Sequence, residues 1–135
     1  MTERDPIVLV LPPQPSAVVL ARAFVAEHAV DLSEDLKNDA ELLVSELVSN
    51  AVQHGQPAIV LRVNTDPPGI GVEVSDKGGF LPALPNREPD PRQPNGRGLR
   101  LIDALATSWG VTPADPPPGK TVWFEIRAEG LVQPE

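Results

Sequence analysis

The chain contains no cysteine among its 135 residues, which excludes a disulfide framework and a thiolate metal site. No apolar run approaches the roughly 20 residues that a membrane-spanning helix needs. The N-terminus also lacks the succession of a basic segment, an apolar core and small residues that marks a secretory signal. We therefore expect a soluble, cytoplasmic protein that has no membrane segment.

Positive charge is scarce, and the net charge of -8 argues against a surface that binds nucleic acid through its phosphates. Residues 27–46 carry seven acids and one base, whereas residues 77–100 carry five bases and two acids. The basic island is suited to a small polyanion, and equally to a charged loop that faces water. The acidic patch over residues 27–41 is a candidate docking surface for a partner, and a solvated helix surface explains it nearly as well.

Length and composition indicate one domain, residues 1–135, with a core over about 17–127. Hydrophobic periodicity and turn residues predict helices at 17–29, capped by Ser16, and from Ser33 to His54, stopped by Gly55. A third helix is predicted directly after Gly98. Strands are predicted at 7–11, 59–64, 72–76, 109–112 and 120–127. A proline-rich stretch at 80–95 shows no helix or strand period and is of a length often found in functional lids, so we assign a lid to about 79–95.

This order of elements predicts an α/β (α+β) two-layer sandwich. Its sheet would be mixed and largely antiparallel, with the helices packed on one face. Regular strand–helix alternation and a P-loop lysine motif are both absent, so the sequence does not indicate a doubly wound nucleotide-binding fold.

The organising stretch is the helix over residues 41–54, in which Glu46 and Asn50 lie one turn apart at the margin of an apolar stripe. A carboxylate and an amide in this position are suited to hold a divalent cation or to place a proton acceptor in a cleft. A solvated polar stripe is the alternative. Downstream, alternation puts Asp76 on the buried side of a strand end, where an unpaired carboxylate would be costly without donors.

Glycines supply the remaining signals. Gly96 and Gly98 precede an amphipathic helix, where backbone N–H groups and the helix dipole attract phosphate. Arg97 and Arg100 could add charge-assisted contacts. A flexible entry to the helix explains two glycines equally well.

Taken together, four segments resemble the motifs of the GHKL (Bergerat) ATP-binding family, in particular its small bacterial anti-sigma-factor kinase-like members. The segments are ELVSNAVQH, which resembles the N box, and SDKGGF, GRGLRLI and GKTVWFEI, which resemble the three glycine boxes. They occur in the family's order, and the resemblance covers about residues 17–126.

The resemblance implies ATP and Mg²⁺ as cofactors and a role for each matching residue. Glu46 would be the catalytic general base, and Asn50 the magnesium ligand that bridges the phosphates. Asp76 would accept from the adenine amino group, beside Gly78, which would let the base approach the backbone. The phosphates would be cradled by Gly96, Arg97, Gly98 and Leu99, with Thr121 near the adenine edge. His54, at the end of the N box, is better explained as a structural histidine than as a catalytic one.

In such relatives the γ-phosphate passes to a serine of a small antagonist protein, which competes with a sigma factor for the kinase. The resemblance therefore implies a protein serine kinase whose partners are a STAS-like antagonist, a sigma factor or both, and a homodimer is common among such proteins. Two alternatives remain: a non-catalytic ATP-binding module of the same fold, and a domain with no nucleotide site. Retention of Glu46 favours the kinase, and the proline-rich lid favours the non-catalytic module.

Overall fold

The computed structural model describes residues 5–65, 69–79 and 94–128, with the side chains of residues 94–98 excluded. The lid predicted at 79–95 therefore lies almost entirely outside the described residues. The elements, in chain order, are β1 (Ile7–Leu11), α1 (Ser16–His28), α2 (Glu34–His54), β2 (Ile59–Asn64), β3 (Gly69–Asp76), α3 (Pro94–Leu105), β4 (Ser108–Pro113) and β5 (Lys120–Arg127).

The five strands form one sheet in the order β1-β2-β3-β5-β4. Every neighbouring pair among these described strands is antiparallel, so the sheet is antiparallel throughout and not mixed. β1 lies at one edge of the sheet, a position that suits a strand followed by two prolines.

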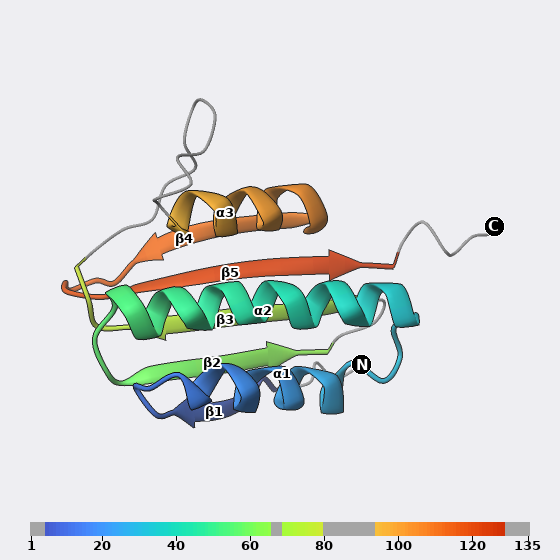
Figure 1. Cartoon of the computed structure of the whole chain (residues 1–135), viewed down its shortest axis with the longest axis horizontal. Helices are drawn as coiled ribbons and strands as arrows, with labels where there is room; N and C mark the ends of the chain where they lie inside the picture. The colour runs from blue at the N-terminus through green and yellow to red at the C-terminus, as the bar shows by residue number, and fades with distance from the viewer. Residues whose placement is uncertain (1–4, 66–68, 80–93, 129–135) are drawn as a thin grey trace.

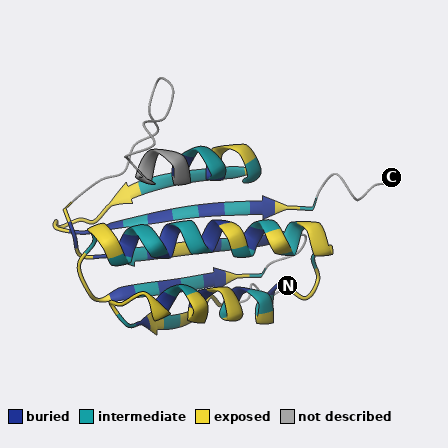
Figure 2. Ribbon diagram, in the orientation of Figure 1, coloured by how far each residue is buried: buried dark blue, intermediate teal, exposed yellow. Residues whose placement is uncertain are grey.

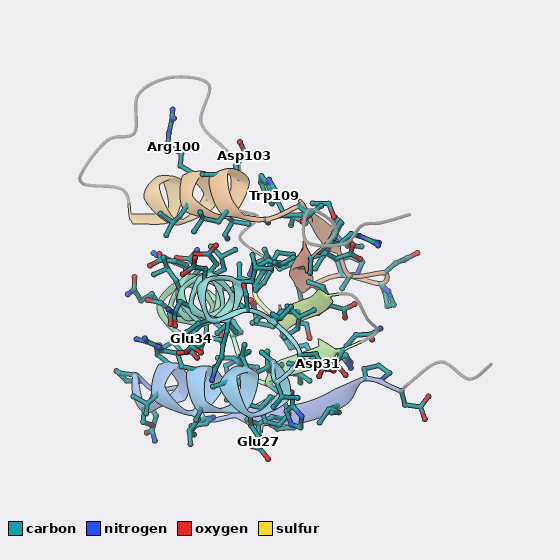
Figure 3. The ribbon with its side chains drawn as sticks, turned by 90° about the vertical axis from the view of Figure 1, so that its right-hand side faces the viewer. Glu27, Asp31, Glu34, Arg100, Asp103 and Trp109 are labelled. Carbon is teal, nitrogen blue, oxygen red and sulfur yellow. The ribbon has the colours of Figure 1, made fainter. Side chains whose placement is uncertain are left out.

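The three helices cover one face of the sheet, and the opposite face carries no helix (Figure 1). A view turned by 90° shows the same two layers, with the helices on one side and the strands on the other (Figure 3). The core lies between them, where the inward side chains of α2 meet those of the central strands, as the burial colours of Figure 2 show. Phe124 is the largest fully buried side chain. The predicted two-layer α+β sandwich is thus confirmed.

α2 is the longest described helix, and it lies along the central strands, in front of β3 (Figure 1). The Ser33 hydroxyl accepts from the Leu36 amide at 3.2 Å, which caps the helix start, and Glu34 and Asp35 place acids in the first turn. At the other end, Gly55 is the C-cap with φ of -95°, so a left-handed conformation is not the reason for glycine there.

The prediction for the start of α1 is wrong by one residue. Ser16 is the first helical residue and makes no capping bond, and Pro15 takes the N-cap position. The Ser16 hydroxyl instead accepts from the Gln14 side-chain amide at 3.2 Å. A proline with its fixed φ starts this helix in place of a side-chain cap.

α3 begins at Pro94, before the two glycines and not after them. Proline is favoured in the first turn because it has no N–H to leave unsatisfied. At its other end, α3 is tied to β4, because the Trp109 indole Nε1 donates to Asp103 Oδ1 at 2.8 Å (Figure 3). Within the described residues, no helix is both long and apolar enough to cross a membrane.

Candidate functional site

A small recess lies between the C-terminal half of α2, the end of β3 and the start of β5. Its lining residues come from these three elements: Leu47, Asn50, Ala51, His54, Val74, Asp76, Lys120 and Val122. Its volume is about 10 Å³, which is room for about one water molecule. The recess therefore brings together Asn50 and Asp76, two of the residues that the sequence analysis selected.

Asp76 is the buried polar centre of this recess, with 5% of the residue exposed. Its Oδ1 accepts from the Gly78 amide at 2.6 Å and from the Gln56 amide at 3.3 Å. The Gln56 carbonyl in turn accepts from the Lys77 amide at 2.9 Å, which ties the end of α2 to the end of β3. The prediction that the carboxylate needs donors is confirmed, and the donors come from the chain itself.

The second oxygen of Asp76 is bound by a lysine. The Lys120 Nζ lies 2.6 Å from Asp76 Oδ2, and the side chains are 6% and 2% exposed, respectively. The two residues are directly opposite each other in the β3–β5 ladder, which directs both side chains to the same face. A buried ion pair of this kind is strongly destabilised if only one partner is removed.

Lys120 was missed by the sequence analysis, although the sequence carries a signal for it. Residues 120–127 alternate, so Lys120 shares a face with Val122 and Phe124. In the structure this face of β5 is the buried one, and Ile126 belongs to it as well.

The same alternation places Thr121 on the opposite face of β5, paired in register with Ser75 and Thr112, and it does not line the recess. Lys120 is the residue of this segment that lies beside Asp76. The role of Thr121 near the adenine edge stays a prediction.

Two glycines let the chain close around Asp76. A Cβ on Gly55 would lie 2.5 Å from Asp76 Cγ, and a Cβ on Gly78 would lie 3.0 Å from both Asp76 Oδ1 and Gly55 Cα. Gly78 thus allows backbone segments to approach each other and the carboxylate. A Cβ on Gly79 would meet nothing within 4 Å among the described residues, so this position makes no such demand.

Glu46 and Asn50 are both half-buried on α2, one turn apart. Asn50 lines the recess, whereas Glu46 lies one turn further from it along the helix. His54 also lines the recess at the last turn, although the residue as a whole is exposed.

The second glycine box lies in the first turns of α3, which packs against α2. Leu99 is fully buried in the core, so it anchors the helix. Because the first four N–H groups of a helix, counted from the N-cap, have no intrahelical partner, a start at Pro94 leaves the amides of Asn95 and Gly96 available to an anion. The amide of Arg97 is the first that can bond within the helix. Of the predicted phosphate-binding residues, Gly96 is therefore the one whose amide is available.

The described residues contain no group of three or more His, Asp or Glu side chains that could hold a metal by themselves. This matches the way in which Mg²⁺ is bound at nucleotide sites, through one or two protein oxygens together with phosphates and water. The Asn50 amide oxygen is a hard ligand of the required type. The residues present therefore fit a phosphate-bridged Mg²⁺ ion.

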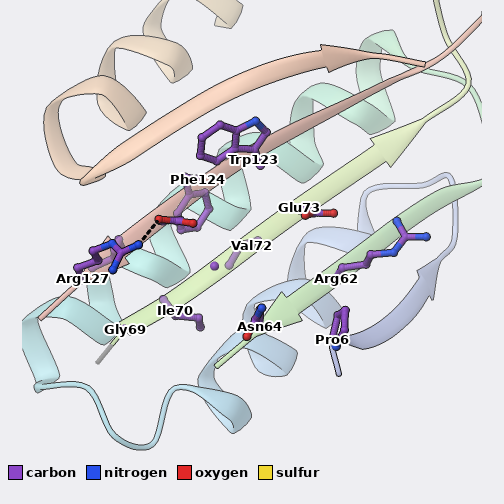
Figure 4. Close-up of a pocket in the computed structure, with 13 residues that line it drawn as sticks. Pro6, Arg62, Asn64, Gly69, Ile70, Val72, Glu73, Trp123, Phe124 and Arg127 are labelled. Carbon is purple, nitrogen blue, oxygen red and sulfur yellow. Dashed lines mark hydrogen bonds and ion pairs between the residues drawn. The ribbon is translucent and has the colours of Figure 1, made fainter. Parts of the chain in front are cut away.

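A larger hollow, about 250 Å³, lies elsewhere, on the face of the sheet that has no helix. The Trp123 indole, Arg62 and the ion pair between Arg127 and Glu125 border it (Figure 4). That pair spans 3.3 Å and is exposed, so it contributes little. None of the predicted site residues lines this hollow. The larger hollow is therefore not the one that contains the predicted site residues.

The architecture and the recess define a class: a two-layer sandwich in which a long helix presents an amide toward a strand-end carboxylate. The sequence matches the family of the histidine kinase-like ATPase domain over residues 11–126. The chain belongs to this family. Membership supports ATP binding, in agreement with the resemblance seen in the four motifs.

Solved structures agree on the fold. The histidine kinase domain of a blue-light activated histidine kinase from Erythrobacter litoralis matches with a TM-score of 0.53 at 20% sequence identity. The match covers 83% of this chain and 59% of that one. No curated protein sequence matches the chain.

Proposed function

We propose that the protein binds ATP with Mg²⁺ and acts as an anti-sigma-factor-like protein serine kinase that phosphorylates a small antagonist protein. The observation that carries the proposal is that Asn50 and Asp76 line one recess between α2 and the ends of β3 and β5. Family membership supports the nucleotide, and the motif resemblance supports the anti-sigma branch of the family.

In this proposal each end of the nucleotide has its own part of the site. Asn50 holds the Mg²⁺ ion, which neutralises phosphate charge during transfer. The free amides at the start of α3 bind the phosphates, because a helix N-terminus favours negative charge. Asp76 accepts from the adenine amino group.

Glu46 is the proposed general base, since it is half-buried and lies one turn from Asn50 on the same helix. It would accept the proton of the antagonist's serine hydroxyl, directly or through a water molecule. Phosphoryl transfer otherwise asks the protein mainly for positioning and charge neutralisation.

The test uses γ-labelled ATP and a STAS-like antagonist protein. Replacing Glu46→Ala should lower the rate of phosphate transfer about 10²–10⁴-fold, which is the usual contribution of a positioned base. ATP affinity, measured by calorimetry with and without Mg²⁺, should be unchanged. The matched control is Glu73→Ala, an exposed carboxylate of β3 outside the acidic patch, which should transfer at the normal rate. Normal transfer by the Glu46 variant would reject Glu46 as the base, and a protein without Mg²⁺-dependent ATP binding would reject the whole proposal.

A second candidate is a non-catalytic module that binds ATP to present a surface to a partner. The ion pair between Lys120 and Asp76 favours it, because a site that is closed by its own side chain suits regulation more than rapid turnover. ATP binding without any transfer to the antagonist, by wild type as well as by the Glu46 variant, would support this candidate. The sigma factor, the antagonist, a homodimer and a cytoplasmic location all remain proposals.

A further inference from the structure

We infer that the Lys120 side chain fills the position of the purine base while no nucleotide is bound. A base then reaches Asp76 only after the Lys120 ammonium has moved away from the carboxylate. The inference rests on the proposed ATP-binding function. It names the residue that sets the apparent affinity of the site for a nucleotide.

The two carboxylate oxygens of Asp76 are held by different kinds of donor. Oδ1 already accepts from the Gly78 and Gln56 amides, at 2.6 and 3.3 Å. Oδ2 accepts from the Lys120 Nζ at 2.6 Å. Backbone amides hold Oδ1 in place through the fold, whereas Oδ2 is held by a flexible side chain. Oδ2 is therefore the oxygen at which a ligand can replace Lys120 as the hydrogen-bond donor.

The recess has no room for a base while Lys120 occupies it. Lys120 enters the recess from β5, directly opposite Asp76 in the ladder. With its side chain inside, the volume is about 10 Å³, enough for about one water molecule. A purine therefore needs the space that Lys120 fills as well as the oxygen to which Lys120 is bound.

The positive charge of Lys120 makes it a competitor of the base for Asp76. The Lys120 ammonium adds a Coulombic attraction to the Asp76 carboxylate that the neutral amino group of adenine lacks, so adenine is a weaker partner for Asp76 than the ammonium. The closed arrangement therefore competes with the nucleotide. If the open form is populated at about 1–10%, the apparent affinity falls about 10–100-fold, because only the open fraction binds.

Base preference is set in the open form. A free Asp76 offers an acceptor, which favours a 6-amino purine over a 6-oxo purine. The closed form admits neither base, so Lys120 lowers the affinities for both by the same factor. Adenine and hypoxanthine, which differ at position 6, therefore separate the role of Asp76 from that of Lys120.

The experiment is calorimetric titration of the full chain with Mg-ATP and with Mg-ITP. The variants are Lys120→Gln, which keeps a neutral N–H donor for Asp76, and Lys120→Met, which keeps the length of the side chain without any donor. We expect ATP affinity to increase from Lys to Gln to Met, by about tenfold or more overall. ITP affinity should increase by the same factor, so the ratio of ATP to ITP affinity should stay constant. Lys37→Met removes the same charge elsewhere and should change neither quantity.

The result that overturns the inference is ATP affinity that is equal or lower in the Lys120 variants while wild type binds ATP. Lys120 would then be a structural residue or a ligand-binding one, and the proposed function would stand. Binding by the variants but not by wild type would support the inference strongly. An absence of ATP binding in all proteins would reject the proposed function together with the inference. Since Gln retains a donor for the buried carboxylate, the sign of the effect is measurable even if the Met variant does not fold.

Discussion

Asp76 connects three parts of the chain that are distant in sequence. It binds the segment after α2 through Gln56, the turn after β3 through Gly78, and the start of β5 through Lys120. Since an unsatisfied buried carboxylate is costly, these three partners are needed for stability as well as for any ligand. The residue that is proposed to recognise the base is therefore also part of the folding core.

At the residue scale, we expect Gly55→Ala to destabilise the protein by about 1–3 kcal/mol, the usual cost of forcing extra atoms into a packed site. The new Cβ would lie 2.5 Å from Asp76 Cγ and 2.7 Å from the Ala51 carbonyl oxygen. Urea denaturation followed by circular dichroism measures the free energy of unfolding.

The control for this prediction is Gly79→Ala, a second glycine near the same carboxylate. Its added Cβ would meet nothing within 4 Å among the described residues, so stability should change by less than about 0.5 kcal/mol. Equal losses in both variants would show that close approach to Asp76 is not the reason for glycine at residue 55.

At the scale of elements, residue patterns predicted α2, β2 and β5 almost to the residue, because caps and strict alternation are local signals. The start of α3 could not be predicted in this way. Glycine has low helix propensity, which suggested a helix beginning after Gly98, yet packing against α2 overrides such propensities.

The candidate site was predictable in part for a similar reason. Asn50 and Asp76 could be predicted because the spacing along one helix and the alternation along one strand determine the face on which each residue lies. The pairing of Lys120 with Asp76 depends on the register between β3 and β5, which lie 44 residues apart in sequence at this contact. Alternation along β5 fixes the face of Lys120, but only the register of two distant strands puts it opposite a carboxylate.

Two serines at helix starts allow a test of capping. Ser33→Ala should lower the free energy of unfolding by about 1 kcal/mol, because its hydroxyl accepts from the Leu36 amide at 3.2 Å. Ser16→Ala is the matched control, and its effect should stay within about 0.5 kcal/mol, since this hydroxyl makes no capping bond. Chemical denaturation of both variants measures the difference, and a larger loss at Ser16 would contradict the assignment of the α1 start.

For the whole molecule, the layers explain why a ligand at one end of the sheet should affect global stability. The recess takes residues from α2, β3 and β5, and these elements also supply much of the core. A ligand that binds only the folded chain therefore stabilises the complete domain.

We expect Mg-ATP at about 100 times its dissociation constant to raise the free energy of unfolding by about 2.7 kcal/mol. The measurement is thermal unfolding at several ATP concentrations. Asn50→Ala should show a much smaller increase at the same concentrations, because the metal ligand is lost. Asn38→Ala, on an exposed position of the same helix, should behave as wild type does. Equal stabilisation of the Asn50 variant would show that the metal site is misplaced.

The two tryptophans lie on opposite sides of the sheet. Trp109 is opposite Phe124 in the ladder, on the side of the helices, and is hydrogen-bonded to Asp103 of α3. Trp123 lies on the other side, where its indole covers Gly110. Because the chain has two tryptophans and no tyrosine, its intrinsic fluorescence is the sum of two indole emissions, which variants that replace one tryptophan by phenylalanine would separate. Emission from Trp109 reports on the helix that begins with the second glycine box, and emission from Trp123 serves as an internal reference from the remote side.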